Sequence, residues 1–285
     1  MKSRLPFSLT IFFYEQMIED EKSKRLPIAL TIAGSDSGAG AGIQADLLTF
    51  ADFHVFGTSA ITALTAQNPD GVKHIQTTSP QNLTIQIQQV LEYFPVAAIK
   101  TGMLPTAELV EIVVSTLSEL SPNVPLVVDP VLVATSGNTL VDNQAFAAIK
   151  EKLLPQATLV TPNLDEVEAL GESRPRNPEE MKQSAEKLAH ASNSAFLVKG
   201  GHLKGDELVD VLAEPDGKTR VFSANRISDV NTHGSGCTLS AAITANLANG
   251  DELPEAVKRG WRYVQKSLQN PLNIFGERFI RHGYN

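Results

Sequence analysis

The sequence predicts an α/β fold in three layers, with a central, mostly parallel sheet and helices on both faces. From residue 26 onward, short apolar runs rich in Val, Ile and Thr alternate with longer segments of helical periodicity. This alternation is the signature of repeated strand–helix–strand units. The segments 208–212 and 220–223 flank a Glu-Pro-Asp-Gly turn at 214–217, which predicts an antiparallel hairpin at the sheet edge.

The same patterns give the expected elements in order. Strands are expected at 28–33, 59–65, 97–100, 126–129, 158–161 and 195–199. Helices are expected at 41–53, 80–94, 106–120, 143–154, 178–191, 235–249 and 253–268. Without an internal repeat or long linker, residues 27–270 are expected to form one domain, between an N-terminal extension, 1–26, and a C-terminal tail, 271–285. The extension is either disordered or the product of a start assigned too far upstream.

Composition argues against several classes of partner. Of the 285 residues, 24 are basic and 32 acidic, and the net charge of −8 opposes attraction to nucleic acid or anionic lipid. No stretch is long and apolar enough to span a bilayer. We therefore expect neither a nucleic-acid nor a membrane partner. The single cysteine makes no intrachain disulfide and fits a reducing compartment, so the expected location is cytoplasmic.

The first motif is a glycine-dense turn at 34–42, between the first strand and the first helix. Backbone N–H groups in such a turn can approach an anion or polar ligand closely. The spacing does not match the dinucleotide fingerprint, because Ile43 stands where its third glycine is needed. No Lys-Ser/Thr pair follows to make a nucleotide P-loop. The alternative is a tight turn that binds nothing.

The second motif, Asn-Thr-His-Gly-Ser-Gly-Cys-Thr at 231–238, opens an Ala-rich helix. Here Gly234, Ser235 and Gly236 can direct successive N–H groups at one point, which suits the charge of a transferring phosphoryl group. Cys237 stands in the first helical turn, where the helix dipole is expected to lower the thiol pKa. The alternative for Cys237 is an inert, small apolar side chain.

Charged residues also follow three of the expected strands. Asp129 and Glu166 could hold a hydrated Mg²⁺, which needs only one or two carboxylates besides phosphate oxygens. Lys199 ends an apolar strand and could reach a phosphate, unless it is an ordinary surface lysine. Asp165 is better explained as a complement to a helix dipole.

Two histidines, His202 and His233, lie beside these motifs. Each stands alone in the sequence, without the Cys/His spacing of a zinc site. We expect both to be satisfied by local hydrogen bonds rather than to ligate a metal.

Eight segments together resemble one enzyme family. They are LTIAGSD at 30–36, GAGIQAD at 40–46, ITALTAQN at 61–68, KTGML at 100–104, DPV at 129–131, TPN at 161–163, KGGH at 199–202 and NTHGSGC at 231–237. Over about residues 27–270, the chain is similar to the hydroxymethylpyrimidine kinase and phosphomethylpyrimidine kinase family, which has the ribokinase-like fold. The chain departs from the usual family pattern at 37–40 and at Ser235.

The resemblance implies roles for individual residues. Asn163 and Glu166 match the Asn-x-x-Glu element that organises Mg²⁺ and phosphates, while Lys199 and Thr232 line the ATP side. Cys237 occupies the place where related sugar kinases carry a catalytic aspartate. The positions around the substrate ring are Gly34, Ala41, Gln67, Met103 and Val131. Of these, Gln67 can donate and accept at once, which matches the ring nitrogen and exocyclic amine of an aminopyrimidine.

The resemblance also implies a function. It is that of a homodimeric kinase using ATP and Mg²⁺ to phosphorylate 4-amino-5-hydroxymethyl-2-methylpyrimidine, its monophosphate, or both, in thiamine biosynthesis or salvage. One alternative is a pyridoxal or pyridoxine kinase of vitamin B6 salvage, against which the context of Gln67 and Met103 argues. The other is a pyrimidine-binding sensor without catalysis, which would not need Asp129, Glu166 or Lys199.

Overall fold

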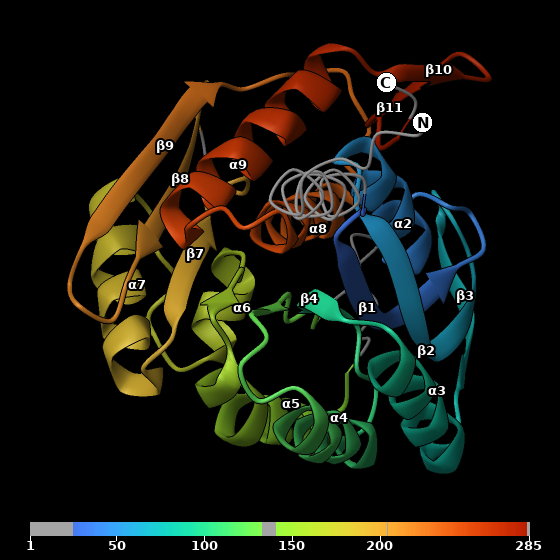
Figure 1. Cartoon of the computed structure of the whole chain (residues 1–285). Helices are drawn as coiled ribbons and strands as arrows, with labels where there is room; N and C mark the ends of the chain where they lie inside the picture. The colour runs from blue at the N-terminus through green and yellow to red at the C-terminus, as the bar shows by residue number, and fades with distance from the viewer. Residues whose placement is uncertain (1–24, 133–140, 204, 284–285) are drawn as a thin grey trace, which may run out of the picture.

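The computed structural model describes residues 25–132, 141–203 and 205–283, and the expected extension at 1–26 lies almost wholly outside them. Within these ranges the chain forms a nine-stranded sheet of order β3-β2-β1-β4-β5-β6-β7-β8-β9 (Figure 1). The strands are β1 (Ile28–Asp36), β2 (Phe56–Asn68), β3 (Gly71–Thr77), β4 (Val96–Thr101), β5 (Leu126–Val128), β6 (Leu159–Val160), β7 (Ala195–Lys199), β8 (Glu207–Ala213) and β9 (Thr219–Asn225).

Helices cover both faces of this sheet, as the sequence predicts (Figure 1). One face carries α3 (Pro80–Tyr93), α4 (Ala107–Leu120), α5 (Asn143–Ala148), α6 (Leu164–Ala169) and α7 (Pro178–Ser192). The other carries α2 (Gly42–Asp52), α8 (Ser235–Ala248) and α9 (Leu253–Gln269).

Alternation along the strands divides the core into two layers. In β1, Leu30 and Ile32 pack with α3 and α4, while Ala29 packs with α2 and α8. Helix α8 is buried on all sides from Thr238 to Ala248, because α9 covers the side away from the sheet. At Gly260 of α9, an added Cβ would lie 2.8 Å from Ile243, so the two helices pack closely.

Strands β2, β1, β4, β5, β6 and β7 are parallel, and β3, β8 and β9 are antiparallel additions at the two edges. The predicted hairpin is β8–β9, with the turn at 214–217. The carboxyl ends of the parallel strands therefore meet at one edge, where ligands of such sheets bind.

Three features differ from the expected elements. Strand β2 continues to Asn68 and returns through β3, which the sequence patterns did not predict. The helix expected at 143–154 consists of α5, a π-helical turn at Ile149–Leu153 and a 3₁₀ turn at Leu154–Gln156. The segment after residue 271 forms a small hairpin, β10 (Leu272–Ile274) and β11 (Glu277–Phe279), and then buries Ile280 in the core.

No helix in the described part of the chain is both long and apolar enough to cross a membrane.

Candidate active site

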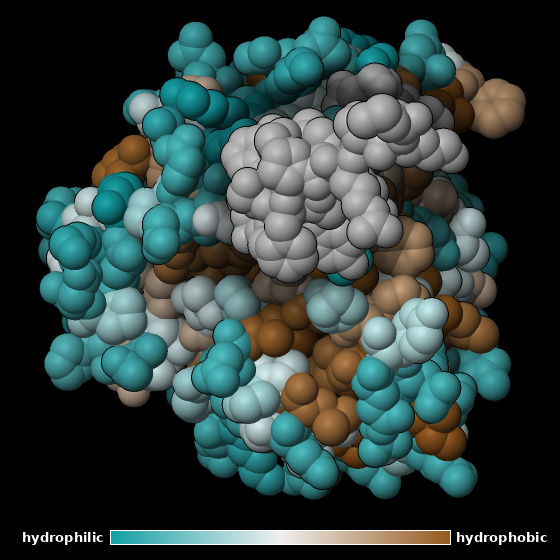
Figure 2. Space-filling view, in the orientation of Figure 1, coloured by the Kyte–Doolittle hydropathy of each residue, from teal (hydrophilic) through white to brown (hydrophobic). Residues whose placement is uncertain are grey.

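A pocket opens at the carboxyl ends of β1, β2, β4, β5, β6 and β7, beside the first turn of α8. Apolar side chains gather near the middle of the face shown in Figure 2, with polar residues around the margin. The pocket brings together every site residue expected from the sequence: Gly34, Ala41, Gln67, Met103, Asp129, Val131, Asn163, Glu166, Lys199, Thr232, Gly234, Ser235, Gly236 and Cys237. Segments up to about 200 residues apart thus meet at one site.

The loop before α8 is shaped by close contact with the first glycine turn. Gly234 is the N-cap of α8 and has a φ of 79°, which a residue with a Cβ adopts at a cost in strain. A Cβ there would also collide with the carbonyl of Gly40. No side chain caps this helix, so the N–H groups of Gly236 and Cys237 stay available at its N-terminus. Such an end binds anions.

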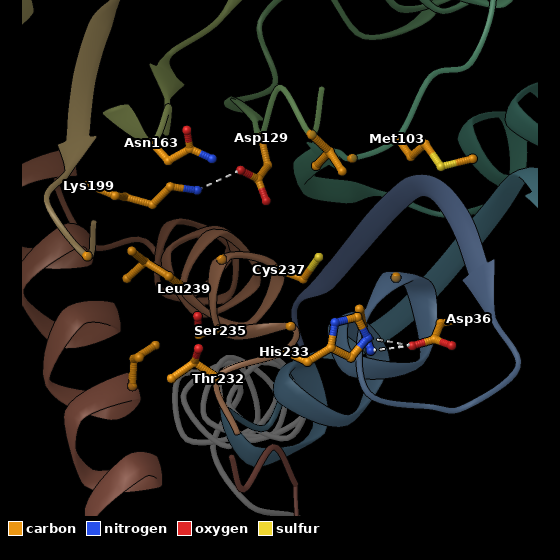
Figure 3. Close-up of a pocket in the computed structure, with 18 of the residues that line it drawn as sticks. Asp36, Met103, Asp129, Asn163, Lys199, Thr232, His233, Ser235, Cys237 and Leu239 are labelled. Atoms are coloured by element: carbon orange, nitrogen blue, oxygen red, sulfur yellow. Dashed lines mark hydrogen bonds and ion pairs between the residues drawn. The ribbon is translucent and has the colours of Figure 1, made fainter. Parts of the chain in front are cut away.

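A buried ion pair lies next to this helix end (Figure 3). The Nζ atom of Lys199 is 3.0 Å from Oδ1 of Asp129, and a Cβ on Gly236 would lie 3.2 Å from the same nitrogen. Burial alone would raise the pKa of Asp129, but Lys199 and Lys100 hold it below its usual value. Asp129 is therefore ionised.

Glu166 completes this polar end of the pocket. It forms a capping box with Asn163, in which each residue's side chain accepts the backbone N–H of the other at 2.9 and 2.7 Å. Burial raises the pKa of Glu166, Lys199 opposes the rise, and the charge of Asp129 adds to it. A cation between the two carboxylates would relieve this repulsion, so the pair suits a metal that also takes phosphate oxygens. Among the described residues, no cluster of three or more acidic, His or Cys side chains forms a metal site.

Cys237 lies between the two ends of the pocket (Figure 3). Its residue is partly exposed, but protein atoms surround the thiol, and this burial raises the pKa to about 11 although Lys100 and the N–H of Gly42 favour the thiolate. The expectation of a lowered thiol pKa is therefore wrong for the unliganded protein. Desolvation outweighs the helix dipole. The catalytic role of Cys237 stays a prediction.

The opposite end of the pocket is less charged. Gln67 lies at the end of β2, and Met103 contacts Gly34, whose added Cβ would lie 3.6 Å from its sulfur. Val131 has a φ of 45°, a strained conformation for a β-branched residue that is common at ligand sites. The side chain of Gln67 reaches His233, which in turn contacts Asp36 (Figure 3).

Sequence reasoning missed the ion pair between Lys100, which lines the pocket, and Asp46. Both side chains are fully buried, and Nζ of Lys100 lies 2.6 and 2.7 Å from the two carboxylate oxygens. Thr31 donates a further hydrogen bond to Asp46 at 2.6 Å. Burial would lower the pKa of Lys100, but Asp46 raises it above its usual value, so the ammonium is charged. A lysine that ends a strand and an aspartate in a helix gave no signal of pairing, because 54 residues separate them.

The contacts of the two histidines are not local in the sequence. His202 is exposed and lies 3.2 Å from Asp165, and His233 contacts Gln67 and Asp36, which are 166 and 197 residues away. Asp165 also pairs with Arg174 at the surface, away from the polar end of the pocket.

Comparison with known proteins identifies the family. The model of the phosphomethylpyrimidine kinase family matches residues 36–280. The chain belongs to this family. A hydroxymethylpyrimidine/phosphomethylpyrimidine kinase of Synechococcus elongatus is 42% identical over 250 residues, which cover 87% of this chain and 94% of the relative.

Solved structures agree with this assignment. Phosphomethylpyrimidine kinase from Clostridium difficile has a TM-score of 0.75 at 37% identity, covering 86% of this chain and 100% of that one. Pyridoxal kinase from Bacillus subtilis, in an ADP complex, has a TM-score of 0.81 at 33% identity, covering 90% and 98%. The fold is therefore ribokinase-like, as the motifs predict, and the chain is a phosphotransferase of a kinase family.

Proposed function

We propose that this chain transfers the γ-phosphoryl group of ATP to the hydroxymethyl group of 4-amino-5-hydroxymethyl-2-methylpyrimidine and to the resulting monophosphate, in thiamine biosynthesis or salvage. The observation that carries the proposal is the two-ended pocket. The helix N-terminus, Lys199 and two carboxylates stand at one end, and Gln67 with apolar neighbours stands at the other. The names of the family and of the Synechococcus relative support the substrate.

Each group of pocket residues has its own role in the proposed phosphoryl transfer. Mg²⁺, when bound by Asp129 and Glu166, supplies positive charge against the phosphates. Lys199 adds a further charge, and the N–H groups of Gly236 and Cys237 stabilise the charge that develops on the transferring group. Asn163 and Thr232 line the nucleotide side. The ring is held so that the oxygen of its hydroxymethyl or phosphate group meets the transferring phosphoryl group in line. The residues that hold it are Gln67, Gly34, Ala41, Met103 and Val131.

Cys237 is placed to act as general base for the alcohol. A hydroxymethyl group carries a proton that must leave, whereas a phosphate monoester, with a second pKa of about 6, is already largely ionised at neutral pH. We expect Cys237→Ala to lower kcat on the alcohol about a hundredfold and kcat on the monophosphate less than tenfold. Steady-state kinetics on both substrates measure this, with the Tm as a control for folding. An equal drop on both would instead make Cys237 part of the anion-binding geometry.

The pH dependence of the first phosphorylation follows from the raised thiol pKa. With a pKa of about 11, Cys237 is almost entirely protonated at pH 7, and each further pH unit multiplies the thiolate fraction about tenfold. We therefore expect log kcat/KM for the alcohol to rise with a slope near one between about pH 7 and 9. The rise should vanish in Cys237→Ala. A flat profile in the unsubstituted enzyme would contradict the assigned base.

Phosphorylation of pyridoxal is the second candidate, because the Bacillus subtilis structure with a TM-score of 0.81 is a pyridoxal kinase. Pyridoxal also bears a hydroxymethyl group, but the proposal places an aminopyrimidine against Gln67. The test is a side-by-side assay of the pyrimidine alcohol, its monophosphate and pyridoxal with Mg-ATP, followed by product analysis. A higher kcat/KM for pyridoxal than for both pyrimidines would reverse the assignment.

A homodimeric state and a cytoplasmic location are further proposals. The first is supported by the family resemblance, and the second by the single cysteine of the chain. Light scattering coupled to size-exclusion chromatography tests the dimer.

A further inference from the structure

His233 joins the two sides of the pocket through one ring nitrogen. Its Nε2 atom lies 3.2 Å from Oδ2 of Asp36 and 3.1 Å from the atom of the Gln67 carboxamide that is assigned as Nε2, although the nitrogen and oxygen of an amide are told apart only by their hydrogen bonds. Gln67 is near the end of β2. Asp36 ends β1 and His233 precedes α8 (Figure 3). The three residues thus connect the first glycine turn, the substrate end and the phosphate end of the pocket.

Asp36 is ionised in this arrangement. Its carboxylate accepts backbone N–H groups from Gly38, Gly40 and Ala41 at 2.7, 3.1 and 2.9 Å. Burial raises its pKa, but the bonds from His233 and the backbone outweigh that effect and leave the pKa below its usual value. A carboxylate has no hydrogen to donate, so Nε2 of His233 must carry the hydrogen that lies between them. This holds whether the imidazole is neutral or charged.

The proton on His233 decides how the Gln67 amide is turned. The single Nε2–H of His233 can be shared between Asp36 and Gln67 only if the carboxamide end that faces it is the oxygen, since an amide nitrogen accepts no hydrogen bond, so the Gln67 amide is reversed from its assigned orientation. The NH₂ group of Gln67 then points away from His233. The carboxamide oxygen has two lone pairs, and His233 uses only one of them. Gln67 therefore offers an N–H donor and one free acceptor at fixed positions, with the acceptor on the side of His233.

Hydrogen bonds fix the backbone of Gln67, so rotation of its side-chain amide is the main motion that remains. The N–H of Gln67 donates to Oγ of Ser37 at 2.8 Å, and that hydroxyl donates to the carbonyl of Gln67 at 2.7 Å. The ring of His233 is also confined, because a Cβ on Gly40 would lie 2.7 Å from its Cδ2 atom. The backbone N–H of His233 is bonded to Asn231 at 2.9 Å. Rotation of a terminal amide costs little unless a partner holds it.

We propose that Asp36 and His233 are positioning residues that lock the Gln67 amide and thereby select an amino-substituted over an oxo-substituted ring. This inference rests on the proposed function. In an aminopyrimidine, a ring nitrogen that accepts stands beside an amine that donates, which matches the locked amide. In the 4-oxo analogue, the ring nitrogen carries a hydrogen and the neighbouring oxygen accepts. That ring fits only the reversed amide, which the proton on His233 forbids.

The test compares kcat/KM for the aminopyrimidine alcohol and its 4-oxo analogue. In His233→Leu the amide is free to turn, so the amino-to-oxo ratio is expected to fall about tenfold, mainly through KM. His233→Gln keeps an N–H near Asp36 and is expected to restore most of the ratio. The matched control is His282→Gln. Nε2 of His282 lies 3.0 Å from the carbonyl oxygen of Ala39, which belongs to the glycine turn at 34–42, and its described hydrogen bond does not involve Gln67. It should leave the ratio unchanged.

Two outcomes would overturn the inference: an unchanged ratio in His233→Leu, or an equal fall in His282→Gln. Dissociation constants from calorimetry give the same ratio without turnover. If the wild-type protein binds the amino ring more tightly than the oxo ring but transfers no phosphate, the proposed function is wrong and this inference still holds. If His233→Leu does not fold, His233→Ala is measured instead, with the same expected fall in the ratio. An unchanged ratio in that variant would contradict the locked amide.

Discussion

Asp129→Asn is expected to lower kcat at least about a hundredfold on both pyrimidine substrates while leaving their binding nearly unchanged. The carboxylate lies 3.0 Å from Nζ of Lys199 and beside the helix end that is proposed to receive the phosphates. Asparagine keeps the shape of the side chain but removes the charge that pairs with Lys199 and that is proposed to hold the metal. The metal charge matters chiefly while the phosphoryl group moves, so kcat falls and pyrimidine affinity does not. Steady-state kinetics at saturating Mg-ATP measure the first quantity, and calorimetry without nucleotide measures the second.

A matched control separates this effect from a general loss of acidic charge. Glu168 is in α6, but its side chain is 59% exposed and faces Arg174 at 4.0 Å rather than the pocket. Glu168→Gln should retain the unsubstituted kcat. If Asp129→Asn also retained it, the assigned metal role of Asp129 would be wrong. If pyrimidine affinity fell in parallel with kcat, the substitution would have disturbed the whole pocket.

Lys100→Met is expected to destabilise the fold by about 3–5 kcal/mol, the usual cost of breaking a buried ion pair from one side. Both partners are fully buried, and the substitution leaves Asp46 with Thr31 as its one remaining donor in the described contacts. Urea unfolding followed by fluorescence or circular dichroism gives the free energy. The double variant Lys100→Met with Asp46→Leu removes both charges and should recover much of the loss.

The chain offers a surface pair for comparison. Lys152 and Glu111 form an ion pair whose side chains are 48% and 56% exposed. Such pairs contribute at most about 1 kcal/mol, so Lys152→Met should have a small effect. If Lys100→Met cost no more than Lys152→Met, the buried pair would not matter for stability. If the double variant lost as much as Lys100→Met alone, the cost would lie in packing rather than in an unpaired charge.

The parallel part of the fold was predictable because its patterns are local. The run at 195–199 was predicted as the strand that the structure shows, and the helices at 80–94 and 106–120 differ by one residue at an end. Strand β3 was missed because its residues are mostly exposed at a sheet edge and carry polar side chains among few apolar ones. The π-helical turn at 149–153 was missed because it continues a helix without a break in the apolar pattern.

The site was predictable as a set of residues but not as a network. Each motif followed a strand, and strands of a parallel sheet deliver their carboxyl ends to one edge. Contacts between the motifs had no such local cause. The role of Asp36 in holding the glycine turn, and its link to His233, depend on how far the two loops approach each other. The thiol pKa of Cys237 was predicted in the wrong direction, because a helix N-terminus is visible in a sequence and the burial of one sulfur atom is not.

The contacts that close the pocket also span most of the chain. Asp36 and His233 are 197 residues apart, Gln67 and His233 are 166 apart, and Ala39 and His282 are 243 apart. Contacts that close such long loops carry a high entropic cost and tend to form late in folding. During synthesis, the glycine turn emerges long before its partners at 231–238 and 282. A ligand that contacts both the glycine turn and the segment 231–237 therefore needs a chain that already contains both segments.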